Sequence, residues 1–338
     1  MSNLRDRLKR IKESKKDEAP ESVHANNNVI PVFKGWESCG FKVLKRSINT
    51  PSPFKIKKMP EALPVFIPDL ERRNLPGVQD FLFFDLETTG LSGGAGTVAF
   101  LAAFGRILNG KLNVTQYLLL DYPGEIDFLN NVLTELKTDN PIIASYNGKC
   151  FDSQIIKTRC LMNRIKPPPF YHADLLHPAR RLWKNIINDC SQSSVEKNIL
   201  GINRIDDIPG SQAPEIWFEF LKTGETERLF GICDHNLSDI TGLASILAAI
   251  ISIAQKPFEE VEYKYDKERL TRFIYKYAYR QMLIGNYKEP LELINKGLEI
   301  IKHDELWYNK LLRRKLRLEK LITEEVHTEA RRIWKQPS

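Results

Sequence analysis

The order of apolar patterns between residues 80 and 163 constrains the fold more than any other feature of the sequence. Strand-like runs separated by turns come first, and helical periods enter after them. In order, the patterns are the strands FLFF, TVAFLAAFGRI (97–107) and VTQYLLL (114–120), the helix EIDFLNNVLTELK (125–137), the strand PIIASY (141–146) and a helix from Phe151 to about Asn163. This β-β-β-α-β-α order predicts an α/β domain.

The chain continues with a strand near residues 170–174 and then with helices. The clearest helix runs from about Glu227 to Ala254, and its apolar residues grow dense toward the end, which predicts that this end is buried. Before the domain lies a basic leader whose scattered prolines predict irregular structure. The sequence is therefore divided into the leader (1–79), the α/β domain (80–256) and a tail (257–338).

The tail is predicted to be all-α. Its stretch YAYRQMLIGNYKEPLELINKGLEII is similar to a tetratricopeptide repeat, with Gly285 and Tyr287 at the turn and Gly297 as a small residue in the second helix. Pro290 stands where that pattern has Ala, and one repeat is fewer than the usual three or more, so helices docked on the α/β domain are the alternative. The tail also offers a surface for a protein partner. The clustered cations of KLLRRKLRLEK either contact nucleic acid or form a solvated helix face.

Composition favours a globular, cytoplasmic protein without a membrane segment. The chain has 338 residues with 42% hydrophobic composition, no run of the roughly 18 apolar residues that a membrane span needs, and no apolar signal segment after its charged N-terminus. Its five cysteines form no CxxC pair, which predicts reduced thiols. The formal charge of +7 permits an anionic partner such as nucleic acid but does not identify one.

Two carboxylates follow the first strand of the domain directly, in FFDLETTG. Asp85 and Glu87 lie two positions apart, and because strand side chains alternate, both project from the same face. Like charges held together at a buried sheet end either share a proton or are neutralised by a cation, and a metal ion meets this need most simply. Ordinary turn chemistry at the end of a strand is the alternative.

Three further polar residues extend this pattern. Asp152 begins the helix after the tight YNGKCF connection, where an isolated acid would be stabilised by the helix dipole alone. His235 and Asp239, in CDHNLSDITGLASI, lie four residues apart and therefore share one helix face. A solvated polar face near a helix start is the alternative for this pair, but four acids in one α/β domain favour a common site.

These motifs resemble a known family. The order DLETTG, YNGKCFD and HNLSD resembles the DEDD (DnaQ-like) superfamily of 3′–5′ exonucleases on a ribonuclease-H-like fold. The pieces LSGGAGT, HADLLHPARRLW, LGINRIDDIPG and HNLSD are similar to the bacterial YprB-type proteins, a ribonuclease-H-like group predicted to be exonucleases. The resemblance covers about residues 80–255 and implies a mixed sheet flanked by helices.

The resemblance also implies a mechanism. Asp85, Glu87, Asp152 and Asp239 would hold two divalent cations, Mg²⁺ or Mn²⁺, for two-metal hydrolysis of a phosphodiester in DNA or RNA. His235 would take the proton from the attacking water. Here the chain departs from the pattern, because the histidine stands four residues before the last Asp, as the tyrosine does in the Tyr-type branch, and not five.

Several residues beside the acids are candidate substrate contacts. Thr88, Thr89 and Gly90 begin a Gly-rich loop that either lets a nucleotide approach the backbone or is a flexible hairpin loop. Tyr146 and Asn147 either contact a sugar or base or serve turn and core packing. In HADLLHPARR, capping of the next helix is favoured over a metal site, and the two arginines either bind phosphate or face solvent.

The sequence thus predicts a metal-dependent 3′–5′ exonuclease with a nucleic acid substrate. Two alternatives remain at this level: a catalytically weak or inactive module of the same fold that binds nucleic acid or protein, and a structure-specific endonuclease. Retention of four acids and a histidine favours catalysis.

Overall fold

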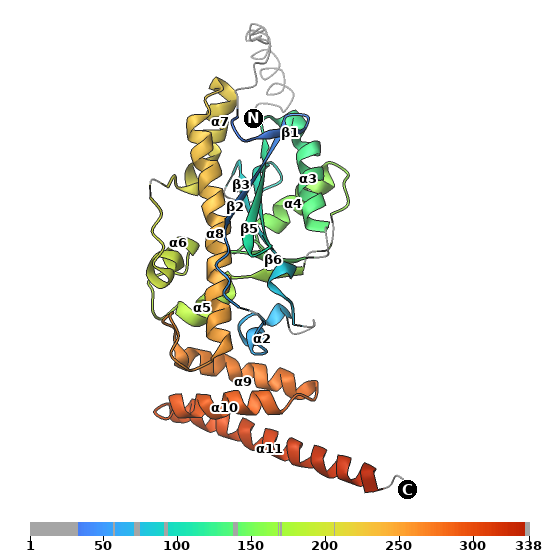
Figure 1. Cartoon of the computed structure of the whole chain (residues 1–338), viewed down its shortest axis with the longest axis vertical. Coiled ribbons are helices and arrows are strands. Elements are labelled where there is room, and N and C mark those ends of the chain that lie inside the picture. The colour runs from blue at the N-terminus through green and yellow to red at the C-terminus, as the bar shows by residue number, and fades with distance from the viewer. Residues whose placement is uncertain are drawn as a thin grey trace, which may run out of the picture. The chain divides into compact units, whose positions relative to one another are not determined.

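One mixed sheet forms the centre of the α/β region (Figure 1). In the described part of the chain it has seven strands in the order β1-β2-β5-β4-β3-β6-β7. The strands are β1 (Glu37–Gly40), β2 (Val43–Pro51), β3 (Phe81–Thr88), β4 (Ala99–Leu108), β5 (Lys111–Leu119), β6 (Ile142–Ser145) and β7 (Tyr171–Asp174). Pairing is antiparallel from β1 to β3 and parallel from β3 through β6 to β7, which confirms the mixed sheet.

This computed structural model describes residues 33–334 apart from 57, 71–74, 91–93, 138–140, 168, 170 and 206, with side chains up to residue 328. The helices are α2 (Leu63–Phe66), α3 (Glu125–Lys137), α4 (Asp152–Met162), α5 (Leu176–Trp183), α6 (Gln192–Val195), α7 (Ala213–Thr223), α8 (Glu227–Gln255), α9 (Lys267–Leu283), α10 (Lys288–Ile300) and α11 (Glu305–Trp334). Residues 1–32 of the predicted basic leader lie outside the described residues.

The prediction of an irregular leader is wrong for residues 37–51. These residues form β1 and β2, and β2 pairs with β5 over nine positions from Val43↔Leu119 to Pro51↔Lys111. Pro51 and Pro53 fall at or beyond the end of β2, so they do not interrupt its pairing. The leader therefore completes the sheet of the α/β domain.

Helix α8 covers one face of the sheet, and α3 covers the other (Figure 1). On the α8 side, a Cβ at Gly105 of β4 would lie 2.6 Å from Ile240 Cγ2, so the absence of a side chain lets the helix approach closely. On the α3 side, the Tyr117 hydroxyl donates to Glu135 over 2.9 Å. Alternate residues of the central strands thus contact different helices, as the period of a strand requires.

Helix α8 is long and apolar enough to cross a membrane, contrary to the expectation that no segment passes this test. In the structure, 61% of its most apolar 18-residue window is buried. Its buried side chains, such as Leu243, Leu247 and Ile250, belong to the hydrophobic core. The helix has the burial of a core helix, because it packs on β3, β4 and β5.

The tail is helical, as predicted, with α9 and α10 joined at Gly285, whose φ of +81° suits a residue without a side chain. A Cβ at Gly297 would lie 3.0 Å from Thr271 Cγ2, so this glycine allows α9 and α10 to approach closely. Helix α9 contacts α5 and α2. The tetratricopeptide likeness and the division at residue 257 stay predictions.

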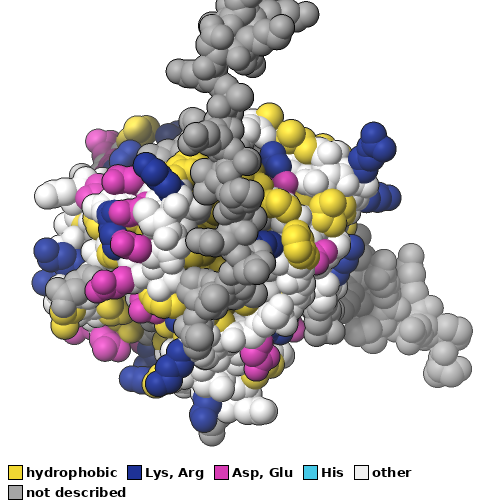
Figure 2. Space-filling model, turned by 90° about the horizontal axis from the view of Figure 1, so that it is seen from above, with side chains coloured by type: hydrophobic (Ala, Val, Ile, Leu, Met, Phe, Trp, Pro, Cys, Tyr) yellow, Lys and Arg dark blue, Asp and Glu magenta, His cyan; other side chains and the backbone are white. Residues whose placement is uncertain are grey.

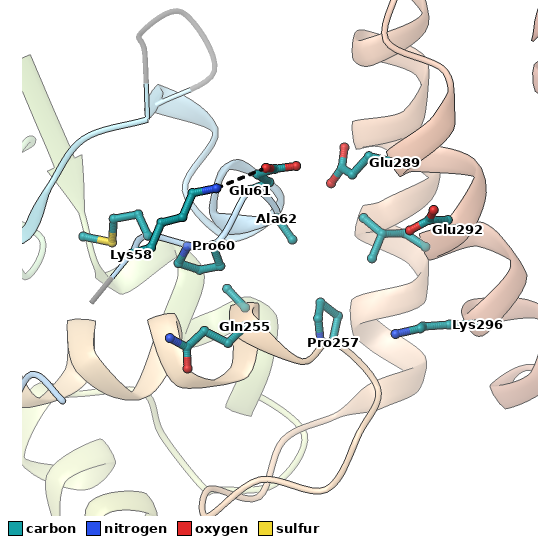
Figure 3. A pocket seen from close by; sticks show the side chains of 12 residues that line it. Lys58, Pro60, Glu61, Ala62, Gln255, Pro257, Glu289, Glu292 and Lys296 are labelled. Atoms are coloured by element: carbon teal, nitrogen blue, oxygen red, sulfur yellow. Dashed lines mark ion pairs between the residues drawn. The ribbon is translucent and has the colours of Figure 1, made fainter. Parts of the chain in front are cut away.

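A hollow of about 400 Å³ lies where residues 58–62, the end of α8 and α10 meet (Figure 3). Glu289 and Glu292 line it from α10, and Lys58 pairs with Glu61 on its other side at 3.7 Å. Burial raises the pKa of Glu289 to about 7, although its carboxylate accepts a hydrogen bond from the Tyr277 hydroxyl. Tyr277 belongs to α9, so this hydrogen bond joins two helices of the tail at the edge of the hollow.

Candidate metal centre

The end of β3 presents Asp85 and Glu87 toward α8. Asn236 of α8 donates from Nδ2 to Asp85 Oδ2 over 2.7 Å, and Glu87 Oε1 lies 4.0 Å from His235 Nε2. Both contacts lie on the face of the sheet that α8 covers, so the two-residue spacing does place the carboxylates on one face. Glu87 is 7% exposed, and Asp85 is partly buried.

Asp152 is the first residue of α4, and it is buried. The turn before it explains the Asn-Gly pair: Asn147 has a φ of +64°, and a Cβ at Gly148 would lie 2.5 Å from Asp152 Oδ2. Asp174, at the end of β7, accepts the backbone N–H groups of Asn147 and Lys149 at 2.8 and 3.2 Å. Asp174 therefore fixes the turn that leads into Asp152.

His235 and Asp239 lie one turn apart on α8, as their spacing predicts. His235 Nε2 lies 3.2 Å from Asp239 Oδ2, while Nδ1 on the other side of the ring lies 2.7 Å from Asp207 Oδ1. Ligand atoms of Glu87, His235 and Asp239 all lie within 4.8 Å of one another, a spacing at which these residues could share a cation. The histidine side chain is 14% exposed.

Arg204 holds the second oxygen of Asp239. Its Nη2 atom lies 2.7 Å from Asp239 Oδ1, and the same guanidinium is bidentate to the buried Glu196, with contacts of 2.7 and 2.8 Å. Gln192 Nε2 also donates to the backbone oxygen of Asp239 over 2.8 Å. These contacts, from α6 and from the segment that follows it, fix the orientation of the carboxylate before any cation is considered.

The electrostatics of this group are those of an uncompensated acid cluster. Burial, followed by the charges of Asp239, Asp152 and Glu87, raises the pKa of Asp85 well above its usual value. Burial and the charges of Asp239 and Asp152 do the same to the pKa of Glu87. Burial and the charges of Asp174 and Asp239 raise the pKa of Asp152 to about 7. The four predicted acids are thus close enough to repel one another.

This donor set fits divalent cations. Carboxylate oxygens are the ligands that Mg²⁺ and Mn²⁺ prefer, and a cation would remove the repulsion that raises these pKa values. Arg204 supplies positive charge to Asp239, but it is also paired with Glu196 and lies 3.2 Å from Asp207. The guanidinium therefore compensates only part of the local negative charge.

The threonines after Glu87 make hydrogen bonds within the β3–β4 connection. The Thr88 hydroxyl donates to the Gly90 carbonyl over 2.9 Å, and Thr89 Oγ1 accepts the Val98 N–H over 2.9 Å. Part of the Gly-rich loop, residues 91–93, lies outside the described residues. These bonds shape the start of the loop, and contact of Thr88, Thr89 and Gly90 with a substrate stays a prediction.

Tyr146 and its neighbours have partners within the fold. The Tyr146 hydroxyl donates to the Cys190 carbonyl over 2.6 Å, and Asn147 occupies the turn described above. His172 contacts Ser145 and Ser153, and burial lowers its pKa to about 4, so it is neutral. Asp174 accepts the Leu176 N–H at the start of α5, which agrees with the predicted capping role. Substrate contact by Tyr146 and Asn147 stays a prediction.

Arg180 and Arg181, the two arginines for which phosphate binding and a solvated helix face were the alternatives, differ from each other. Arg181 donates to the Phe66 carbonyl and lies over the Phe273 ring at 5.2 Å, so it joins α5 to the neighbouring elements. Arg180 is exposed, and its backbone oxygen accepts from Arg269 Nε. Of the two, Arg180 has the side chain that faces solvent.

Sequence reasoning missed the residues that orient the centre. Asp207 and Arg204 lie in LGINRIDDIPG, a piece that carried the family resemblance but was given no role. Gly210 belongs to the same segment, and a Cβ there would lie 3.1 Å from His235 Nε2. Asn236, which holds Asp85, directly follows His235 in the HNLSD piece that carried the resemblance, and this position was the signal that could have found it.

The comparisons with known proteins agree with this architecture. A family model described as the RNase_H superfamily matches residues 82–251, half of the chain. The chain belongs to the RNase_H superfamily. It is also 32% identical over 290 residues to a Bacillus subtilis (strain 168) protein named "Uncharacterized protein YprB", an alignment that covers 77% of this chain and 70% of that protein.

Membership in the RNase_H superfamily gives the acid cluster a chemical context. The superfamily suggests a nuclease, which implies a nucleic acid substrate. Such nucleases usually use divalent metals, and the acidic group at Glu87, His235 and Asp239 is a candidate place for one.

Proposed function

We propose that this protein hydrolyses phosphodiester bonds as a 3′–5′ exonuclease of the DEDD type. The observation that carries the proposal is the convergence of Asp85, Glu87, Asp152 and Asp239: burial and the charges of neighbouring acids raise the pKa values of the first three, and Asp239 is among those charges for each of them. These four carboxylates would hold two divalent cations. Bound there, the cations would activate water and stabilise the leaving oxygen of the phosphodiester.

His235 is the proposed general base. The Asp207 carboxylate accepts hydrogen bonds, so its 2.7 Å contact favours the tautomer that carries the proton on Nδ1. The unprotonated Nε2 then faces Glu87 and Asp239, where a proton from the attacking water would arrive. The four-residue spacing therefore supports the base role, because one helical turn directs the imidazole toward the acids and not away from them.

A hollow of about 480 Å³ opens beside this histidine. It lies between the 202–207 segment and α8, and hydroxyl groups of Ser238 and Thr241 line it together with Asp207. Its lining includes His235 and Asp207 but none of the four acids, so the hollow adjoins the histidine and not the acid cluster itself.

The test is a substrate panel with and without Mg²⁺ or Mn²⁺, on single- and double-stranded DNA and RNA labelled at the 5′ end. The proposal predicts a ladder of products that shortens from the 3′ end and disappears when EDTA is added. Internal fragments appearing first would instead identify an endonuclease. Binding without any metal-dependent cleavage would identify an inactive binding module.

The cations of α11 are expected to add affinity and no chemistry, since no acid or nucleophile cluster accompanies them. On the face shown in Figure 2, lysines, arginines and acids lie interspersed, so the net charge alone does not select a binding surface. Replacing the exposed residues Arg313, Arg317 and Lys320 by glutamine should weaken nucleic acid binding and flatten its salt dependence, by a slope of about one per lost phosphate contact.

Filter binding or anisotropy over a salt series measures this effect. The matched control replaces three exposed lysines elsewhere, Lys55, Lys111 and Lys222, by glutamine. Equal losses in both variants would show that net charge, and not α11, sets the affinity. Single-turnover cleavage at saturating protein should be the same in both.

We also place the protein in the cytoplasm. All five cysteines are free thiols, which fits a reducing compartment.

A further inference from the structure

Four side-chain positions form one row across the centre of the sheet. Arg46 of β2 pairs with Gln116 of β5, Gln116 pairs with Ala103 of β4, and Ala103 pairs with Asp85 of β3. Residues directly opposite each other on neighbouring strands project to the same face. The row therefore runs from the leader strand to the candidate metal ligand beneath α8.

The small side chain of Ala103 leaves the space that Asn236 fills from α8. Asn236 is fully buried, and its Nδ2 donates to Asp85 Oδ2 over 2.7 Å. Its Oδ1 accepts from Gln116 Nε2 over 2.8 Å, and the same nitrogen donates to the Cys233 carbonyl. The Asn236 amide thus bridges Gln116 and Asp85, the two polar residues on either side of Ala103 in the row.

The orientation of both amides follows from two contacts of Gln116, with Arg46 at its oxygen and with the Cys233 carbonyl at its NH₂ group. A guanidinium only donates, so Gln116 must turn its oxygen to Arg46 Nε, which it contacts at 2.5 Å. The Gln116 NH₂ group then faces Asn236. The Asn236 side chain must therefore accept this hydrogen bond with its oxygen, and its own NH₂ group points to Asp85. Arg46 is fixed in turn by Asp234 at 2.9 Å and by the Trp36 ring at 4.8 Å.

We propose that Arg46, Gln116 and Asn236 form a positioning relay that keeps an amide N–H on Asp85 Oδ2 and so presents the other carboxylate oxygen to a cation. The inference rests on the proposed function, since it assigns Asp85 to the metal centre. It also gives the leader strand β2 a part in the site, because β2 supplies the arginine that helps to set the direction of the relay.

The deciding variants are Gln116→Glu and Gln116→Leu. Glutamate keeps the shape of the side chain and the bond to Arg46, but it replaces the NH₂ donor with an acceptor. The Asn236 amide should then turn its NH₂ group to position 116 and its oxygen to Asp85. Leucine removes all these bonds, including the one to Arg46, and lets the Asn236 amide keep either orientation. In both variants the Cys233 carbonyl loses its donor.

The relay and a purely structural role predict opposite rankings of the two variants in Mn²⁺ affinity. With the relay, Gln116→Glu lowers Mn²⁺ affinity by about 10- to 100-fold and lowers it more than Gln116→Leu, although Gln116→Leu is the less stable protein. If the amides only satisfy one another in the core, metal affinity follows thermal stability and Gln116→Leu is the worse variant in both. That result would overturn the inference.

Mn²⁺ titration by electron paramagnetic resonance, thermal unfolding and single-turnover cleavage are measured on the full chain. Asn113→Asp is the matched control, because it makes the same amide-to-acid change on β5, where Asn113 bonds to Asn49 of β2 outside the row. It should leave Mn²⁺ affinity unchanged. Wild-type protein that binds no Mn²⁺ and cleaves nothing would refute the proposed function, and this inference with it. Wild-type activity with an unaffected Gln116→Glu variant would refute the relay alone.

Discussion

Asp239→Asn is expected to abolish both Mn²⁺ binding and cleavage, whereas His235→Ala should abolish neither. Asparagine keeps the size of the side chain and leaves the Arg204–Glu196 pair in place, but it removes a charge from the acid group. His235→Ala should bind Mn²⁺ with nearly wild-type affinity and slow cleavage by about 10²- to 10⁴-fold, the usual contribution of a positioned general base. His235 Nε2 lies 3.2 Å from Asp239 Oδ2, yet the two variants should differ in these measurements.

The pair of readouts distinguishes two roles that the geometry allows for the imidazole. Since His235 Nε2 lies within the same small group as Glu87 and Asp239, it could bind a cation directly. A His235→Ala protein that loses Mn²⁺ binding would show a metal ligand, and one that cleaves at the wild-type rate would exclude both roles.

Asp207→Asn serves as the graded control for the base role. It keeps a partner at His235 Nδ1 but weakens its preference for the tautomer that frees Nε2. Cleavage should fall by about 10- to 100-fold while Mn²⁺ affinity holds. An unchanged rate would mean that Asp207 only packs against the ring.

The predicted elements were accurate where the periodicity was strong. Helix α3 has the predicted bounds, and α8 differs from its prediction by one residue, because long amphipathic or apolar patterns define a helix with little help from the rest of the chain. Strand β2 was missed because its sequence, VLKRSINTP, is mostly polar and lies among prolines. Its burial and pairing depend on β5, more than sixty residues away.

The same distinction applies to the site. Asp85, Glu87 and Asp152 were identified because acids at the end of a strand or at the start of a helix contrast with their apolar surroundings, and Asp239 was identified by its four-residue spacing from His235. Their partners carry no such local signal. Asn236 contacts Asp85, which lies 151 positions away in the sequence, and Asp207 contacts His235, which lies 28 positions away. Only tertiary structure brings these side chains together, so the sequence could predict the acids of the candidate centre but not the side chains that contact them.

Asp152→Asn is expected to make the metal-free protein more stable and the enzyme inactive. The pKa of Asp152 is raised to about 7 in the folded protein by burial and by Asp174 and Asp239, from an ordinary value of 3.8. A raised carboxyl pKa means that folding favours the protonated form, so this group's contribution to stability is complete below pH 3.8 and is lost as pH rises through about 7. Asparagine is neutral at every pH and avoids that loss.

In EDTA at about pH 8, Asp152→Asn should therefore unfold at a higher temperature than wild type, with a free energy of unfolding that is greater by on the order of 4 kcal/mol. The difference should vanish near pH 4. Glu225→Gln removes a charge at an exposed position and should change neither value. Adding Mg²⁺ should stabilise wild type more than the variant, because bound cations relieve the repulsion that asparagine has already removed. If the metal-free variant is instead less stable than wild type at about pH 8, the folded protein stabilises the charged form of Asp152. That result would refute the excess of negative charge from which we infer a metal centre.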